Sequence, residues 1–280
     1  MPAEVAAIVL SLISAAFWGA GDFTGGLTTK QSDVFGVVIV AHFAGFVLLV
    51  GLALFSGEAI PPTDDLLWSA AAGIAGVIGL AAFYRGLSLG NMGLIAPITA
   101  VLATSIPVVF TIFTDGLPDA LKVLGFMLAL IGVWFVSRGD GLAVISRRGL
   151  QLAIIGALGF GGFFILIDQA ETTSVVWKLI AARGGSTLFM IALALMLKRR
   201  WLPDKKYVPA MVMVGLLDLG GNAFFVLAEQ QGRLDVAAVL SSLYPAVTIL
   251  LARILLQERL SPHQLFGIAA ALVAIMLIAV

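Results

Sequence analysis

The stretch YVPAMVMVGLLDLGGNAFFVLA, residues 207–228, is long and apolar enough to cross a membrane, and it contains a carboxylate near its middle. A membrane-spanning helix needs about 20 mainly apolar residues. The carboxylate is Asp218, and the amide of Asn222 follows one helical turn later. The segment therefore raises two questions: how many such helices the chain has, and what surrounds the acid.

The composition indicates a membrane protein with many spans. The chain has 280 residues, of which 61% are hydrophobic and 11% are charged, whereas soluble domains have about 25% charged residues. The 16 basic and 16 acidic residues balance, so the net charge does not indicate a nucleic-acid partner. The absence of cysteine excludes disulfides, thiolate metal sites and a cysteine nucleophile.

Apolar segments separated by short polar breaks predict ten helices and an all-α membrane bundle. Strands of membrane barrels alternate apolar and polar residues, and these segments do not. The first segment is expected to be a spanning helix and not a cleaved signal. The predicted helices are 4–24, 33–55, 66–88, 93–113, 119–137, 149–168, 174–197, 207–228, 234–256 and 262–280. We expect a multi-pass protein of the plasma (inner) membrane.

The chain also repeats itself. A shift of 142 residues aligns Gly73, Gly79, Gly90 and Gly125 with Gly215, Gly221, Gly232 and Gly267, and it aligns the polar breaks as well. This predicts two five-helix repeats, 1–140 and 141–280, within one membrane domain. An odd number of spans per repeat makes the second copy face the opposite way, as in many secondary transporters.

The sequence resembles the EamA type of the drug/metabolite transporter superfamily over nearly its whole length. The resemblance is carried by FWGAGDF at 17–23, by the segment around Arg183, and by SSLYPAVTILLARILLQERLSPHQLFG at 241–267. Pro245, Glu258 and Gly267 match the family pattern, whereas His42 stands where an arginine is usual and Gly116 where a glutamate is usual. The resemblance implies a ten-helix transporter of small metabolites or drugs that works without ATP.

Asp218 with Asn222 is the leading candidate site. The repeat aligns Asp218 with Gly76, so the shared scaffold does not need an acid there. A central aspartate costs about 2.5–3.5 kcal/mol in a spanning helix, which a wet cavity, a basic partner or a bound proton would offset. We expect Asp218 to bind substrate or to carry a proton. The alternative is a carboxylate that hydrogen-bonds to a neighbouring helix only for packing.

Further candidates for substrate binding or proton coupling are Asp22, Trp18, Tyr84, Arg85, His42, Arg183, Ser241 and Tyr244. Asp22 either lines the cavity or lies at the interface near Lys30. Arg85 faces the cavity or extends to the headgroups. Arg183 binds a substrate carboxylate or neutralises Asp218 or Asp168. His42 either titrates or donates a single hydrogen bond.

Three prolines and a glycine stripe concern the helices themselves. Pro97, Pro107 and Pro245 each remove a backbone donor and are predicted to kink helices that act as gates, or simply to bend them. Gly73, Gly76 and Gly79, together with GFGG at 159–162, predict close helix contacts.

No phosphate-binding loop or zinc-protease motif is present, so we expect no ATP hydrolysis, no cofactor and no metal. We expect a secondary transporter, a monomer or homodimer, that exports an amino acid or related metabolite and is either proton-coupled or driven by the solute gradient. Multidrug efflux and uptake of a sugar-like solute are alternatives, and an intramembrane lipid enzyme or scaffold is the alternative of another class. Most Lys and Arg residues, such as Lys30, Arg148 and Lys198, follow odd-numbered segments. The positive-inside rule then places both termini outside the cytoplasm, whereas the resemblance implies cytoplasmic termini.

Overall fold

The computed structural model describes residues 3–88, 92–114, 116–136, 146–199, 201–256 and 262–279. All regular secondary structure within these ranges is helical. The elements are α1 (Ala3–Thr29), α2 (Val34–Ser56), α3 (Thr63–Ser88), α4 (Met92–Thr114), α5 (Ala120–Val136), α6 (Arg147–Asp168), α7 (Val175–Met196), the 3-10 helix η1 (Lys205–Tyr207), α8 (Val208–Glu229), α9 (Leu234–Ser241), α10 (Tyr244–Leu256) and α11 (Pro262–Ala279). The all-α prediction is therefore confirmed for the described residues.

Local chemistry explains where several of these helices begin. The side chains of Asp33, Ser146 and Ser174 accept hydrogen bonds from backbone N–H groups in the first turns of α2, α6 and α7, which satisfies donors that a helix start leaves free. Gly57 ends α2 in a left-handed conformation with φ 67°. Gly116 has φ 86°, and this backbone conformation favours the glycine found there.

Two helices differ from the prediction. The first extends to Thr29, and in its last turns the hydroxyls of Thr24, Thr28 and Thr29 donate to carbonyls one turn back, so these polar side chains are satisfied within the helix. The predicted helix 234–256 is divided into α9 and α10. Pro245 has no N–H with which to continue the helix.

At this break the Ser242 hydroxyl donates to the Val239 carbonyl (2.6 Å), and the Ala246 N–H donates to the Leu243 carbonyl (2.9 Å). The chain therefore has a discontinuous helix at Pro245 where a kink was predicted. Pro97 and Pro107 both lie in α4, which continues as one helix past them, and Pro107 is buried.

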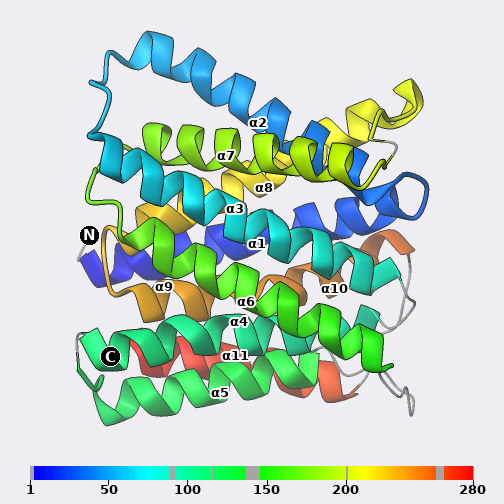
Figure 1. The fold of residues 1–280 in the computed structure, drawn as a ribbon. Helices are drawn as coiled ribbons and strands as arrows, with labels where there is room; N and C mark the ends of the chain where they lie inside the picture. Colours follow the sequence, from blue (N-terminus) through cyan, green and yellow to red (C-terminus); the bar gives the residue numbers. More distant parts are fainter. Residues whose placement is uncertain are drawn as a thin grey trace.

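The helices lie side by side and run between two ends of the molecule, with the first and last described residues at the same end (Figure 1). The closest helix pairs are α3 with α6, α1 with α8, and α5 with α11. In Figure 1, α2 lies along one edge of the bundle and α5 with α11 along the opposite edge.

The glycine stripe predicted to allow close approach does so. A Cβ on Gly73 would overlap the Ala182 backbone of α7, and a Cβ on Gly215 of α8 would overlap the Ala41 backbone of α2. Gly79 likewise packs directly against the backbone of α6. Helices in lipid approach closely through such small residues.

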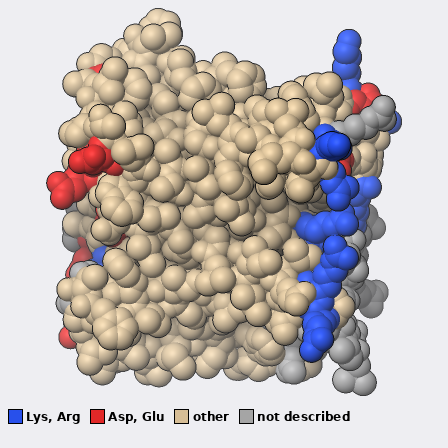
Figure 2. Space-filling view, in the orientation of Figure 1, with Lys and Arg blue, Asp and Glu red and all other residues tan. Residues whose placement is uncertain are grey.

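The surface has the polarity of a protein that spans a bilayer. Six stretches in the described residues are long and apolar enough to cross a membrane: α1, α2, α3, α6, α7 and η1 with α8. Large apolar side chains such as Phe55 and Phe113 face outward, 91% and 85% exposed. In the view of Figure 2, charged side chains gather at the two ends of the bundle and the flank between them is uncharged. The chain is a multi-pass membrane protein.

Candidate functional site

A cavity lies in the middle of the bundle. Its wall comes from α1, α2, α3, α4, α6, α7, α8, the α9–α10 break and α10. Its volume is about 90 Å³, and a water molecule needs only about 10–15 Å³ by this measure. The polar lining residues are Asp22, His42, Thr104, Arg183, Ser186, Asp218, Asn222, Ser242 and Tyr244. The cavity is therefore mainly apolar but contains several polar groups, and it is large enough to hold several waters or part of a small solute.

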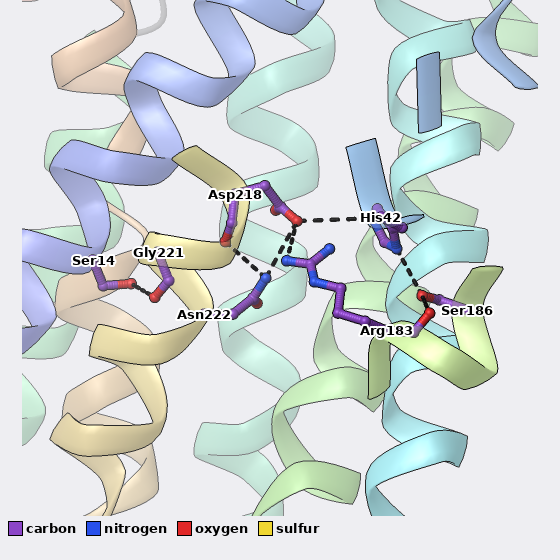
Figure 3. Close-up of polar contacts among 7 residues, drawn as sticks. All are labelled: Ser14, His42, Arg183, Ser186, Asp218, Gly221 and Asn222. Atoms are coloured by element: carbon purple, nitrogen blue, oxygen red, sulfur yellow. Dashed lines mark hydrogen bonds and ion pairs between the residues drawn. The ribbon is translucent and has the colours of Figure 1, made fainter. Parts of the chain in front are cut away.

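Asp218 lies in this wall and forms an ion pair. Its Oδ2 is 2.5 Å from Nη2 of Arg183 on α7 and 3.7 Å from Nε2 of His42 on α2 (Figure 3). The Asp218 side chain is 19% exposed, whereas those of Arg183 and His42 are 4% and 7% exposed. Of the two partners that the sequence offered for Arg183, the structure pairs it with Asp218.

The hydrogen bonds around His42 specify its proton arrangement. The Ser186 hydroxyl donates to the Arg183 carbonyl (3.0 Å), and His42 Nδ1 is 2.7 Å from the Ser186 oxygen. Because that hydroxyl proton is already used, Nδ1–H of His42 is the donor to Ser186. Nε2 of His42 then faces Asp218, and among the described residues it has no hydrogen-bond partner.

Asn222 holds the acid in place along α8. Its amide nitrogen donates to the Asp218 backbone carbonyl (2.9 Å) and to Oδ2 of Asp218 (3.3 Å). On the residue before Asn222, the Gly221 carbonyl accepts from the Ser14 hydroxyl of α1 at 2.8 Å (Figure 3). The carboxylate of Asp218 therefore joins α8 to α7 through Arg183, and the Gly221–Ser14 hydrogen bond joins α8 to α1.

Neighbouring residues explain why one half has an acid where the other has glycine. A Cβ on Gly76 would lie 3.2 Å from the Phe163 ring of α6. At the corresponding crossing of α8 with α1, the residue opposite Asp218 is Gly21, where an added Cβ would lie 3.5 Å from the Asp218 backbone nitrogen. At one crossing Phe163 of α6 faces Gly76 of α3, and at the other Asp218 of α8 faces Gly21 of α1. A larger residue therefore faces a glycine at both crossings.

Aromatic rings form another part of the wall. The Trp18 ring lies 5.7 Å from that of Phe225 and 5.9 Å from that of Phe164, and Phe160, Phe163 and Phe164 also line the cavity. The sequence analysis missed these three phenylalanines, as well as Thr104, Ser186 and Ser242. Only the repeat could have indicated Phe160, since it stands 142 positions after Trp18.

Asp22 and Tyr244 also line the cavity. Asp22 reaches it from α1, and Tyr244, the first residue of α10, reaches it just after the break that separates α9 from α10. The Tyr244 hydroxyl is buried, and no hydrogen-bond partner lies among the described residues. The wall therefore contains a second acid and a phenol whose hydrogen-bonding capacity is unused.

Three predicted residues do not line this cavity. Tyr84 is 2% exposed and packs against Gly25 of α1. Arg85 is exposed near the end of α3. Ser241 is fully buried, and its hydroxyl donates to the Ser11 carbonyl at 3.3 Å. Glu258, which matches the family pattern, lies outside the described residues.

The fold and the cavity define a class: a multi-pass helical membrane protein with a cavity between its helices that contains several ionisable and polar side chains. The sequence profile of the EamA-like transporter family matches residues 5–138 and again residues 147–280. The chain belongs to this family. The two matches begin 142 residues apart, which is the offset at which the glycines align. Membership makes the chain a membrane transport protein with a small-molecule substrate.

Individual relatives are distant. The chain is 22% identical to the glucose uptake protein GlcU of Bacillus subtilis, over 98% of this chain and 96% of GlcU. It is 25% identical to the uncharacterised protein MJ1333.1 of Methanocaldococcus jannaschii, over 47% of this chain but 93% of that protein. A solved crystal structure shares the fold, with a TM-score of 0.77 and 18% identity over 97% of this chain and 95% of that one.

Proposed function

We propose that this protein is a secondary transporter that binds one small organic solute in the central cavity and exposes it alternately to the two sides of the membrane. The observation that carries the proposal is the buried cluster of His42, Arg183 and Asp218, which joins α2, α7 and α8 at the cavity wall. Ionisable groups are costly in a membrane and mark transport pathways when they face a wet cavity.

Alternating access needs two units that move against each other, and we infer two inverted repeats of five spans, 1–140 and 141–280. The helix contacts support this. If α1 to α5 correspond to α6, α7, α8, α9 with α10, and α11, then the α1–α8 pair corresponds to the α3–α6 pair. In the same correspondence the α2–α8 pair corresponds to the α3–α7 pair, and the α5–α11 pair corresponds to itself. The half-length relative MJ1333.1 also fits a unit of one repeat.

The discontinuous α9–α10 helix is the best candidate for a moving gate. Its break places Ser242 and Tyr244 in the cavity wall, and transporter sites are commonly built from such interrupted helices. Pro97 and Pro107 on α4 are proposed to assist from the corresponding helix of the first half.

The charge of the cavity favours a neutral, hydroxylated solute. Arg183 is the only lysine or arginine in the described lining, and its guanidinium is already paired with Asp218. An amino acid carboxylate would have to compete with Asp218 for it. A sugar-like solute would use Asn222, the hydroxyls and the aromatic rings, and GlcU is a glucose uptake protein by name. Uptake of a sugar-like solute therefore ranks above the predicted export of an amino acid, and family membership favours both over a lipid-modifying enzyme.

The two ends of the molecule support one orientation in the inner membrane. Basic side chains gather at the end that contains the α7–α8 connection, and acidic ones gather at the end where α1 begins (Figure 2). The positive-inside rule places the basic end in the cytoplasm and both termini outside it.

Uptake of labelled D-glucose and labelled L-alanine into proteoliposomes tests the function. We expect saturable glucose uptake by the wild type and loss of uptake with Arg183→Gln. Arg199→Gln is the matched control, because Arg199 is exposed in the α7–α8 connection, and it should transport like the wild type. Alanine uptake in place of glucose uptake would restore the amino acid alternative. Transport by Arg183→Gln at the wild-type rate would contradict the site.

A further inference from the structure

We propose that Asp22, and not Asp218, is the proton-binding site that couples this transporter to a proton gradient. This inference rests on the proposed transport function and specifies how it is driven. The cavity wall contains two carboxyl groups, and their surroundings assign them different roles.

The charge of Asp218 is already matched inside the cavity. Its carboxylate is 2.5 Å from Arg183, whose side chain is 4% exposed, and it also accepts from the Asn222 amide. Protonating Asp218 would leave the buried guanidinium without its counter-ion, and breaking such a buried pair is strongly unfavourable. Asp218 therefore serves as the counter-ion that holds Arg183 in place.

Asp22 is the acid whose charge is not matched. It is half-buried on α1, and in the part of the chain that the structure describes its side chain forms no hydrogen bond or ion pair. It interacts electrostatically with the carboxylate of Asp218 and with the phenols of Tyr84 and Tyr244. A lone carboxylate in a mainly apolar cavity is costly, and a second carboxylate nearby adds repulsion. A bound proton removes both costs.

In the part of the chain that the structure describes, no ion pair joins Asp22 to a cation of the helices packed on α1, and Arg85 of α3 is exposed. Those helices include α2, α3, α8, α9, α10 and α11. Toward the cavity, α2 contributes His42, whose Nδ1 is hydrogen-bonded to Ser186, and α8 contributes Asp218, which is paired with Arg183 of α7. Asp235 of α9 is fully buried and bonded to Arg233. His263 of α11 stacks on Phe135.

The phenol of Tyr244 is suited to both states of such a site. Its hydroxyl is buried without a partner among the described residues, in the wall that also contains Asp22. A hydroxyl donates to a carboxylate and accepts from a carboxylic acid. The Tyr244 hydroxyl can therefore accept a hydrogen bond from protonated Asp22 and donate one to the ionised carboxylate.

A proton fits this site better than a divalent metal ion. Hard divalent cations take six or more oxygen ligands, and the described residues contain no group of three or more His, Asp or Glu side chains placed to hold a metal. In the proposed cycle the Asp22 carboxylate takes a proton from water on one side, the bundle reorients, and the proton leaves to water on the other side.

The first test does not depend on the solute. Infrared difference spectra of the purified protein between low and high pH should contain a carboxylic-acid band that disappears in Asp22→Asn and persists in Asp218→Asn and His42→Gln. Loss of the band in Asp218→Asn alone would overturn the assignment, and so would a band that persists in Asp22→Asn.

The second test uses proteoliposomes and labelled D-glucose. Coupling one proton to one solute lets a pH difference of one unit sustain about tenfold accumulation. Asp22→Asn should lose that accumulation and still exchange labelled for unlabelled glucose, whereas Asp22→Glu should keep both. Loss of exchange as well would assign Asp22 to solute binding and overturn the proposal. Absence of any glucose transport by the wild type would refute the proposed solute and leave the infrared result to decide on Asp22.

Discussion

Breaking the ion pair between Arg183 and Asp218 should destabilise the protein strongly, and removing both charges should restore most of the loss. The side chains of Arg183 and Asp218 are 4% and 19% exposed, so neither group can replace its partner with bulk water. Removing one partner of a buried pair costs about 3–5 kcal/mol, whereas replacing both by neutral groups is often close to neutral. We therefore expect Arg183→Leu and Asp218→Asn each to fall in that range.

The double variant Arg183→Leu/Asp218→Asn should be far more stable than the sum of the single changes predicts. The resulting coupling free energy should be about 3 kcal/mol or more, which corresponds to about two powers of ten in the unfolding equilibrium constant. Unfolding by sodium dodecyl sulfate in lipid–detergent micelles, followed by tryptophan fluorescence, measures it. His42→Gln is the control, because His42 Nε2 is 3.7 Å from Asp218, which is beyond hydrogen-bonding distance, and it should change the coupling little.

Effects of the two single changes that add within about 0.5 kcal/mol would refute this reasoning. They would mean that water screens the pair, and that the cluster does not lie in a low-dielectric wall. Asp218 would then lack the buried ion pair that distinguishes it from an ordinary surface acid and that supports the proposed function.

Three further predictions concern packing, the His42 hydrogen bond and orientation. Gly215→Ala should cost about 1–3 kcal/mol of stability, because its Cβ would overlap the Ala41 backbone. The control Gly51→Ala, with no neighbour within 4 Å of the added atom, should be neutral or stabilising. Equal effects of the two changes would argue against the α2–α8 contact. Ser186→Ala should lower the free energy of unfolding by about 1–3 kcal/mol in the same assay, because it leaves His42 Nδ1 without its partner. An unchanged stability would contradict that hydrogen bond. Because the chain has no cysteine, Ser56→Cys and Lys205→Cys report orientation by themselves: an impermeant maleimide should label the first in intact cells and the second only after permeabilisation, and the reverse pattern would place the termini in the cytoplasm.

The spans could be predicted from the sequence because lipid imposes a length of apolar residues on each one. The predicted segments 33–55 and 207–228 agree with α2 and α8 to within one residue at each end. The break between α9 and α10 could not be predicted in the same way. A proline inside an apolar run indicates a bend, and whether the helix bends or stops depends on hydrogen bonds such as that from Ser242 to Val239.

The site could be predicted in part, for a related reason. A carboxylate in an apolar run must have compensation, so Asp218 pointed to a cavity or a cation before either was located. The choice of Arg183 as the cation depends on how α7 crosses α8, which the periodicity of either helix does not encode. Phenylalanines such as Phe163 gave no signal, because the same residue is ordinary on a lipid-facing surface.

The most direct measurement is the accessibility of one cysteine in the cavity wall from each side of the membrane. Ala103 lines the cavity from α4, and Ala103→Cys adds a single thiol to a chain that otherwise has none. The account predicts that a small impermeant thiol reagent labels Cys at this position from either face, in right-side-out and in inside-out vesicles alike. Labelling from one face only, in a variant that still transports, would contradict alternating access through this cavity.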